Sequence, residues 1–277
     1  MIDLNGSIIS EDSLPFSPLD ASAYYGFSVY ETFYVKNYKV AFFEEHYQRL
    51  KSSCEYFQFP TPLPQDLKQR IKNLITNTSI EHGRLRLIVS PGKFSEIISP
   101  KSITSVLKIE PITKTPNDIK LLITSVRKPE PSVFPPFVKI SSNIVSLLSY
   151  REAKLGGYDE GIMLTTKDHV SEGSYCNLFW TRNNELFTPS LDSSILEGVT
   201  RNKIIEVCNT LNIKINENKY LTKDMEACDN LYISSSTRGL LFVSKLNGRI
   251  FSEDTFNKSN DLKNLYEKLQ NESLEKW

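Results

Sequence analysis

The fold is decided by two runs of sequence: Glu172-Gly173-Ser174-Tyr175-Cys176-Asn177-Leu178-Phe179-Trp180 and, after Thr188-Pro189, Leu196-Glu197-Gly198-Val199-Thr200-Arg201. Residues 177–180 predict a strand, and residues 185–188 predict its partner across a turn at residues 182–185. From Val199 onward apolar residues recur at helical spacing, so a helix is predicted to begin near Thr200.

The start of this helix has features that suit an anion. Gly198 followed by Val199 and Thr200 offers free backbone N–H groups, a hydroxyl and the positive end of a helix dipole, which together can hold a phosphate. Threonine at a helix start is also a common N-cap. From these residues alone, a phosphate site and plain capping both stay open.

The wider pattern is more specific. The order E-G-S-x-x-N-L-F, T-P and I-L-x-G-V-T-R resembles the signature of class IV (fold-type IV) pyridoxal-phosphate enzymes. That family holds branched-chain aminotransferases, D-amino-acid aminotransferases and 4-amino-4-deoxychorismate lyases. The resemblance implies an α/β fold of the two-domain D-amino-acid aminotransferase type. It also implies pyridoxal 5'-phosphate in the interdomain cleft and a homodimer in which a partner loop helps to close the site.

Composition narrows the class of protein. The 277 residues include 33 Lys plus Arg and 33 Asp plus Glu, and this balance gives no support for binding nucleic acid or an anionic membrane. No run of about 18 apolar residues indicates a transmembrane helix. The start at residues 1–6 lacks the regions of a secretory signal, so we expect a cytoplasmic protein. The four cysteines form no C-x-x-C pair and the three histidines share no ligand spacing, so we expect reduced thiols and no metal site.

Periodicity and turn residues predict the order of elements. Hairpin turns are predicted at Asn5-Gly6 and Asn247-Gly248. A Pro- and Thr-rich break at residues 111–117 predicts an N-terminal domain at 1–113, a linker at 114–119 and a C-terminal domain at 120–277. Strands are predicted over 29–35, 40–43, 84–90, 105–110, 120–126, 159–165, 213–215 and 229–234. Helices are predicted over 44–57, 64–76, 200–211, 221–227 and 261–270, and a further helix follows Asn143 and ends near residue 154.

The resemblance extends to the first domain. The family's usual D-R-G-x-x-(F/Y)-G-D-G-V-Y-E-T is kept here at Asp20, Gly26 and residues 29–32, whereas Ala21-Ser22 and Phe27-Ser28 depart from it. The resemblance implies that Tyr30 lines the substrate side or steers the cofactor lysine, although an aromatic core residue on a strand is the alternative. It also places the hydroxyl of Thr32 where the lyases carry a donor near the leaving ether oxygen.

Three charged residues acquire roles from the resemblance. The H-x-x-R-L pattern at residues 46–50 implies that Arg49 reaches the cofactor phosphate. Lys139 precedes a helix carrying Glu152-Ala153 and fits the lysine that holds the cofactor covalently. Glu172 would pair with the pyridine nitrogen and keep it protonated. Taken singly, a helix arginine, a lysine after a short apolar run and a turn glutamate would each be surface residues.

The remaining site residues come from the same comparison. The backbone of Val199, Thr200 and the hydroxyl of Ser236 are expected to hold the phosphate with Arg49, and Thr237 and Arg238 to contact substrate together with Tyr30. Related enzymes often carry an Arg-Gly pair after the strand at 84–90, but this chain has Pro91-Gly92. The possible substitutes for that arginine are Lys93, Arg86 and Arg238.

The expected activity follows from these differences. Arg238-Gly239 and the missing arginine favour a 4-amino-4-deoxychorismate lyase, which gives 4-aminobenzoate and pyruvate in folate biosynthesis. The alternative is a class IV transaminase of branched-chain or D-amino acids. A third possibility, from the unusual residues 21–22 and 27–28, is a binding protein that kept the fold and lost catalysis.

Overall fold

Two units make up the chain in the computed structural model, which describes residues 1–13, 15, 17–112 and 118–277. The first unit comprises Met1–Lys114, Phe137–Ser142 and Gln270–Trp277, and the second comprises Thr115–Pro136 and Asn143–Leu269. Residues 137–142 and 270–277, which the sequence assigned to the C-terminal domain, therefore belong to the first unit. Of the predicted linker at 114–119, residues 114–117 lie outside the described part.

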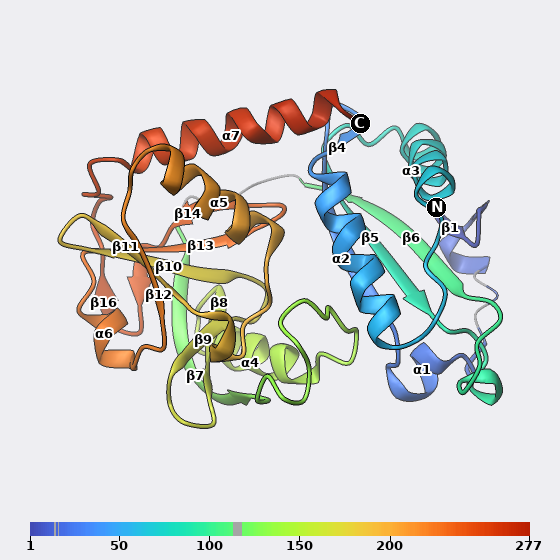
Figure 1. Cartoon of the computed structure of the whole chain (residues 1–277), viewed down its shortest axis with the longest axis horizontal. Helices are drawn as coiled ribbons and strands as arrows, with labels where there is room; N and C mark the ends of the chain where they lie inside the picture. The colour runs from blue at the N-terminus through green and yellow to red at the C-terminus, as the bar shows by residue number, and fades with distance from the viewer. Residues whose placement is uncertain (14, 16, 113–117) are drawn as a thin grey trace. The chain divides into compact units, whose positions relative to one another are not determined.

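The first unit is built on a six-stranded antiparallel sheet with the strand order β2-β1-β6-β5-β3-β4 (Figure 1). Its N-terminal hairpin turns at Asn5 and Gly6, whose φ angles of 50° and 92° are those of the predicted turn. The strands are β1 (Ile2–Leu4), β2 (Ser7–Ile9), β3 (Val29–Lys36), β4 (Lys39–Val40), β5 (Gly83–Ser90) and β6 (Thr104–Pro111), and the helices are η1 (Glu11–Ser13), α1 (Ala21–Tyr25), α2 (Phe43–Tyr56), α3 (Pro64–Thr78) and η2 (Phe94–Glu96).

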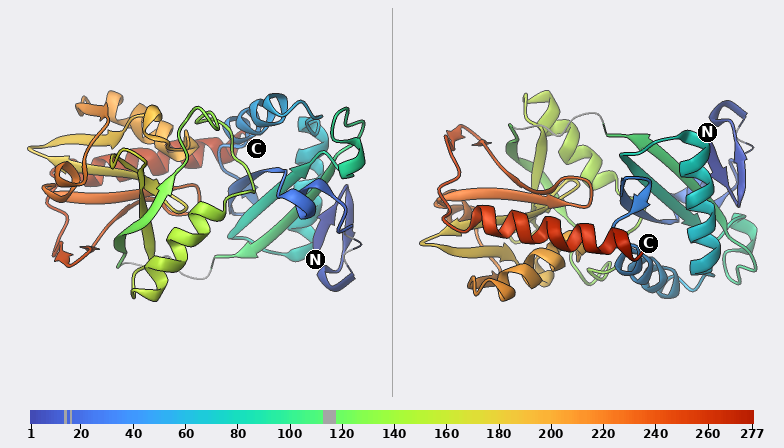
Figure 2. Two further views of the ribbon diagram at one scale, coloured as in Figure 1. Left: turned by 90° about the horizontal axis from the view of Figure 1, so that it is seen from below. Right: turned by 90° about the horizontal axis from the view of Figure 1, so that it is seen from above.

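Alternation decides which face of this sheet is buried. Val29, Phe33 and Val35 of β3 are fully buried in one core with the apolar faces of α2 and α3, which lie against the sheet (Figures 1 and 2). Burying a side chain such as Phe33 contributes about 1.5–3 kcal/mol. Tyr30 and Thr32 alternate with these residues, so they point to the opposite face, where they are only half-buried.

The lysine-bearing segment of the first unit is fixed beside the start of β3. The N–H of Tyr30 donates to the carbonyl of Lys139 (3.0 Å), and the N–H of Ser141 donates to the carbonyl of Ser28 (2.9 Å). Ile140 forms a bridge with Val29. Residues 139–141 therefore form a short extended piece of backbone that holds Lys139 next to Tyr30.

The second unit contains two five-stranded sheets, ordered β12-β11-β10-β13-β14 and β16-β15-β7-β8-β9, which enclose a common apolar core. Helix α4 packs on β7 and β8, and α5 packs on β13. The strands are β7 (Lys120–Lys128), β8 (Glu160–Thr165), β9 (Val170–Gly173), β10 (Asn177–Arg182), β11 (Glu185–Pro189), β12 (Ile215–Asn218), β13 (Asn230–Ser235), β14 (Gly239–Phe242), β15 (Lys245–Leu246) and β16 (Arg249–Ile250), and the helices are α4 (Ile144–Leu155), η3 (Leu191–Ser193), α5 (Val199–Thr210) and α6 (Thr222–Glu226). Helix α7 (Ser259–Glu275) begins in this unit, and its residues from Gln270 onward belong to the first unit.

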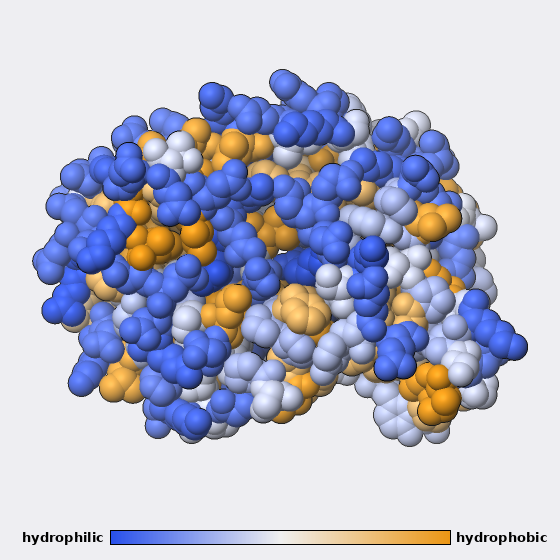
Figure 3. Space-filling view, in the orientation of Figure 1, coloured by the Kyte–Doolittle hydropathy of each residue, from blue (hydrophilic) through white to orange (hydrophobic). Residues whose placement is uncertain are grey.

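Most predicted elements are present, and the differences lie at their ends. The strand predicted up to residue 43 ends at Val40 because α2 already begins at Phe43. The strand predicted at 213–215 is β12, Ile215–Asn218, because it takes its register from the parallel neighbour β11. Among the described residues no helix combines the length and apolarity needed to cross a membrane. Hydrophilic side chains cover most of the face shown in Figure 3.

Candidate active site

Lys139 lies against an aromatic ring in the first unit. Its Nζ is 4.2 Å from the centroid of the Tyr30 ring, and the guanidinium carbon of Arg86 is 5.4 Å from the same centroid. Thr32 is the register partner of Arg86 across β3 and β5. Tyr30 is thus not a core aromatic residue. It stands on the open face of the sheet between an amine and a guanidinium.

A buried ion-pair network lies behind this face. Glu31 is 0% exposed and accepts two hydrogen bonds from Arg49, from Nε and Nη2, both at 2.7 Å. His46 Nδ1 lies 2.8 Å from Oε2 of the same carboxylate, the oxygen that also accepts from Arg49 Nη2. Burial alone would raise the pKa of Glu31, but the Arg49 guanidinium and the His46 ring lower it from 4.5 to about 2. Burial also lowers the pKa of His46, so a neutral imidazole donates to Glu31.

The same helix also contacts the backbone of the lysine segment. Ser53 of α2 donates to the carbonyl of Phe137 (3.2 Å) and accepts from the N–H of Lys139 (3.3 Å). Ser53 follows Arg49 by one helical turn and also lies 2.9 Å from its carbonyl. Arg49 and Lys139, the two cations predicted to hold the cofactor, are therefore positioned by one helix in the first unit.

In the second unit, Glu172 of β9 is held by three donors. Its Oε1 accepts from Lys128 Nζ at 2.9 Å, and its Oε2 accepts from Asn177 Nδ2 at 3.2 Å and from the N–H of Leu196 at 2.8 Å. Glu172 is 7% exposed. One cation and two N–H groups therefore hold this buried carboxylate in one orientation.

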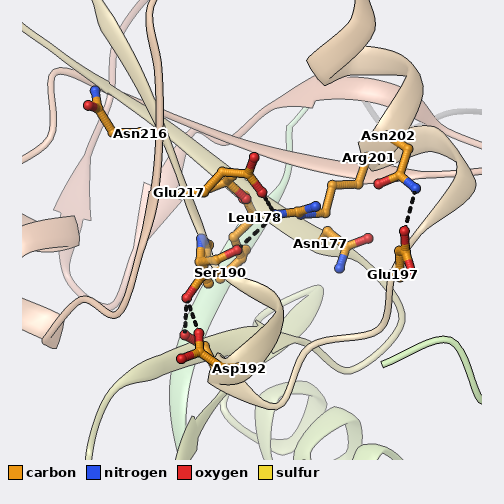
Figure 4. Close-up of polar contacts among 12 residues, drawn as sticks. Asn177, Leu178, Ser190, Asp192, Glu197, Arg201, Asn202, Asn216 and Glu217 are labelled. Carbon is orange, nitrogen blue, oxygen red and sulfur yellow. Dashed lines mark hydrogen bonds and ion pairs between the residues drawn. The ribbon is translucent and has the colours of Figure 1, made fainter. Parts of the chain in front are cut away.

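The N-terminus of α5 is shaped around Asn177. A Cβ on Gly198 would lie 2.1 Å from Asn177 Oδ1, so only glycine fits before the helix. Asn177 also donates to the carbonyl of Leu196 (2.9 Å). Figure 4 shows Arg201, which is buried in this unit, pairing with Glu217. Arg201 also donates to the carbonyl of Pro189 (3.0 Å), and the two contacts anchor the first turn of α5.

One buried hydroxyl at this helix start has no hydrogen-bond partner. Thr200 is 3% exposed, and its Oγ1 is one of the buried polar atoms without a partner in the described part of the chain. Gly198 makes no side-chain cap, so the first N–H groups of α5 are not satisfied by capping. The plain N-cap reading of Thr200 is therefore wrong, because a threonine cap would precede the helix and bond back to it, whereas Thr200 lies within it.

The turn between β13 and β14 carries the three remaining predicted residues. Ser235 and Gly239 pair across it, so Ser236, Thr237 and Arg238 form its tip. Arg238 Nη1 lies 3.3 Å from Oε2 of Glu160, which is 0% exposed. Burial raises the pKa of Glu160, and the Arg238 guanidinium opposes this.

These residues fit pyridoxal 5'-phosphate. A phosphate needs N–H and hydroxyl donors, which the start of α5 offers together with the unpartnered hydroxyl of Thr200. A pyridine nitrogen that carries a proton needs a carboxylate partner, and Glu172, held by Lys128, offers one. The aldehyde needs an amine, which Lys139 offers beside Tyr30.

The predicted residues are distributed over both units. Each unit brings its own set together, and the individual roles remain predictions. The first unit carries Tyr30, Thr32, Arg49 and Lys139, and the second carries Glu172, Val199, Thr200, Ser236, Thr237 and Arg238.

The sequence reading assigned no role to the residues that support these side chains. Lys128 contacts Glu172 across 44 positions of sequence, and nothing in the run around Lys128 signals that partner. Asn177 was recognised only as part of a motif. The contact between Glu31 and His46 joins a strand to a helix. It becomes recognisable only once the fold shows that these two elements face each other.

The chain is similar to proteins of one family over most of its length. The family model for class IV amino-transferases matches residues 28–246. The chain is 30% identical over 248 residues to a probable branched-chain-amino-acid aminotransferase of Thermotoga maritima, covering 88% of this chain and 85% of that one. It is 26% identical over 261 residues to the branched-chain-amino-acid aminotransferase of Escherichia coli, covering 88% and 84%.

Solved structures show the same fold. A branched-chain aminotransferase of Thermoproteus uzoniensis, with norvaline, matches with a TM-score of 0.88 at 22% identity, covering 99% of this chain and 96% of that chain. A putative 4-amino-4-deoxychorismate lyase of Legionella pneumophila matches with a TM-score of 0.85 at 23% identity, covering 94% and 98%. At these identities the likeness supports the fold and does not separate the two activities.

Proposed function

The chain belongs to the class IV aminotransferases, which are enzymes that use pyridoxal 5'-phosphate, and we propose that it is a transaminase of branched-chain amino acids. The names of the relatives support this reading over the lyase reading that the sequence favoured. It corresponds to the alternative that the sequence left open.

The cofactor is assigned to named residues of the chain. We assign its phosphate to Arg49, the N–H groups at the start of α5, Thr200 and Ser236, and its ring nitrogen to Glu172. Lys139 would hold it covalently, and its Nζ, once released, would accept and return the proton of the substrate carbon. The bound cofactor supplies an electron-withdrawing ring that stabilises negative charge on that carbon. Tyr30 restricts where the Lys139 amine can point, since the ring lies 4.2 Å from Nζ.

One observation carries the proposal: a guanidinium contacts the same aromatic ring as the lysine. Arg86 is exposed, contacts the Tyr30 ring, and has no ion-pair partner among the described residues. Neighbouring Arg84, on the same face of β5, is already paired with Glu110. A guanidinium that is not neutralised can bind a substrate carboxylate through two hydrogen bonds. Arg86 thus supplies the contact with the substrate carboxylate that related enzymes take from an arginine at the position of Pro91.

The other two substitutes for the missing arginine are less suitable. Arg238 Nη1 already lies 3.3 Å from the buried side chain of Glu160, and it makes no ring contact with Tyr30 among those found in the described residues. Lys93 lies in the loop after β5, where its backbone forms an isolated bridge with the backbone of Asp20. The arginine on which the lyase reading relied therefore has a structural partner. The lyase stays the second candidate because Thr32 stands opposite Arg86, where its hydroxyl shares the face of Tyr30.

The test is a paired activity assay on purified holoenzyme. L-leucine, L-isoleucine and L-valine are offered with 2-oxoglutarate, D-amino acids are offered in parallel, and aminodeoxychorismate is offered alone. Branched-chain L-donors should give glutamate, and Lys139→Ala should abolish it. If aminodeoxychorismate yields 4-aminobenzoate while no amino acid is converted, the transaminase proposal is wrong and the lyase reading stands.

Arg86 provides the sharper variant. Arg86→Met should lower kcat/KM for the amino acceptor 2-oxoglutarate about 10- to 100-fold, because a charge-assisted hydrogen bond contributes about 1.5–3 kcal/mol. Arg84→Met is the matched control, since it removes the same group from the same face but only a surface pair with Glu110. Equal losses in both variants would show that Arg86 does not contact the acceptor.

A further inference from the structure

We propose that Lys128 is a positioning residue that supplies the opposite charge to Glu172 and holds its carboxylate toward the ring nitrogen of the cofactor. The proposal deepens the proposed function, because it rests on the assignment of Glu172 to that nitrogen. It does not depend on whether the enzyme is a transaminase or a lyase.

The pair spans one strand of the sheet. Lys128 is the last residue of β7 and is the register partner of Thr165 on β8. Glu172 lies on β9, which pairs with the other edge of β8. The two side chains meet across β8 with Nζ 2.9 Å from Oε1, and they are only 17% and 9% exposed. Two strand positions on either side of a central strand hold this geometry more firmly than a loop would.

The hydrogen bonds of Glu172 leave room for one more donor. An ionised carboxylate has about four acceptor positions. Asn177 Nδ2 and the N–H of Leu196 take both positions on Oε2, and Lys128 takes one on Oε1. The remaining position is on Oε1, beside the lysine. The carboxylate is therefore aimed by its fixed Oε2, and its open acceptor is next to a positive charge.

Lys128 supplies the counter-charge of this carboxylate. In the described part of the chain, Lys128 is the only cation within ion-pair distance of Glu172. The two other donors are neutral amides, which orient an oxygen but supply no net charge. Removing one member of a buried ion pair leaves the other charge without compensation. Without Lys128, Oε1 of Glu172 would lose its only partner among the described residues, and the carboxylate would be held toward the ring nitrogen by Oε2 alone.

The structure thus separates orientation from charge. Asn177 and Leu196 fix the direction of Oε2, and Lys128 supplies the opposite charge at Oε1. A replacement that keeps the charge should preserve the ring state even though its shape differs. A replacement that keeps only the length of the side chain should not.

The experiment uses the full chain in four forms besides the wild type: Lys128→Met, Lys128→Arg, Glu172→Gln, and the double variant Lys128→Met/Glu172→Gln. Cofactor-free protein is titrated with pyridoxal 5'-phosphate, and the absorbance band of the bound cofactor is recorded between pH 6 and 9. The melting temperature of each cofactor-free form reports folding. Lys120→Met is the matched control, because Lys120 begins the same strand but pairs with exposed Asp118.

Lys128→Met should weaken cofactor binding about tenfold, the scale found for outer partners of a ligating group, and should shift the absorbance band and its pH dependence. Lys128→Arg should stay within about threefold of wild type, as expected when an ion pair is kept. In the Glu172→Gln background, Lys128→Met should have no further effect. Lys120→Met should behave as wild type.

Two results would overturn the proposal: unchanged binding and spectrum in Lys128→Met, or an effect of Lys128→Met that persists in the Glu172→Gln background. If Lys128→Met fails to fold, Lys128→Gln makes the same comparison, since it also removes the charge. Unaltered cofactor binding in Glu172→Gln alone would instead refute the assignment of Glu172. The substrate assay described above fails or succeeds independently of all these readings.

Discussion

The buried carboxylate of Glu31 makes the strongest energetic prediction. Glu31→Gln removes the charge from a side chain that is 0% exposed and that pairs with Arg49 and His46. The shift of the Glu31 pKa from 4.5 to about 2 corresponds to about 3 kcal/mol at 1.36 kcal/mol for each unit. Breaking a buried ion pair by removing one partner costs about 3–5 kcal/mol. The two figures agree, so we expect a loss of about 3 kcal/mol at neutral pH.

The pH dependence has a definite sign. The pKa of Glu31 is lower in the folded chain than in the unfolded one, so its contribution is complete above pH 4.5 and is lost as the pH falls toward about 2. The pKa of His46 is also lowered by burial, so stability falls as the pH drops below 6.5, where the unfolded histidine gains a proton first. Both groups make the stability of the first unit fall in acid. Glu31→Gln should remove only the pH dependence of stability that lies below pH 4.5.

Hydrogen exchange measures the loss of stability in Glu31→Gln separately for each unit. Peptides covering β3 and α2 should lose protection by a factor of about 100, which is 3 kcal/mol in equilibrium terms, while peptides from β10 should not change. Glu44→Gln is the matched control, because Glu44 lies on the same helix but pairs with Lys68 at the surface, and it should cost less than about 1 kcal/mol. A loss below about fivefold in Glu31→Gln, or equal losses in the two variants, would refute the reasoning.

Two further substitutions test the second unit. Gly198→Ala should displace Asn177, because the added Cβ would lie 2.1 Å from Asn177 Oδ1, and should weaken retention of the cofactor on gel filtration. Gly248→Ala is the control, because a Cβ there would have no atom within 4 Å, and it should retain the cofactor as wild type does. Equal retention in the two variants would contradict the close approach at Gly198. Glu160→Gln and Arg238→Gln should each be destabilising, and the double variant should cost less than their sum, because each single change leaves the other partner of the buried pair unsatisfied. Urea unfolding measures this, and simple additivity would show that the pair does not interact.

Local signals in the sequence predicted most of the elements. The two Asn-Gly hairpins and the Asn183-Asn184 turn are confirmed because positive φ angles are required there, and these residues tolerate them. The alternation of Leu85, Leu87 and Val89 in β5 is confirmed because one face of the sheet is buried. Such features depend on neighbours a few positions away.

The supporting contacts of the site could not be predicted in this way. The Lys128–Glu172 pair and the attachment of residues 139–141 to β3 join positions that are far apart in sequence. Whether Tyr30 faced the core or the substrate depended on the register between β3 and β5, since shifting a strand by one residue exchanges its faces. The motif resemblance supplied candidate residues, but it could not show that Arg238 already had a buried partner.

The division of the chain also has a consequence for its synthesis. The first unit requires residues 137–142 and 270–277, so its core cannot be completed when residue 112 leaves the ribosome. About 160 residues separate the end of β6 from that last segment, which is on the order of ten seconds of translation. During that time the apolar faces of α2 and α3 lack the packing that Trp277 gives to Phe43. The nascent N-terminal half is therefore the stage at which we expect chaperone binding and aggregation to compete with folding.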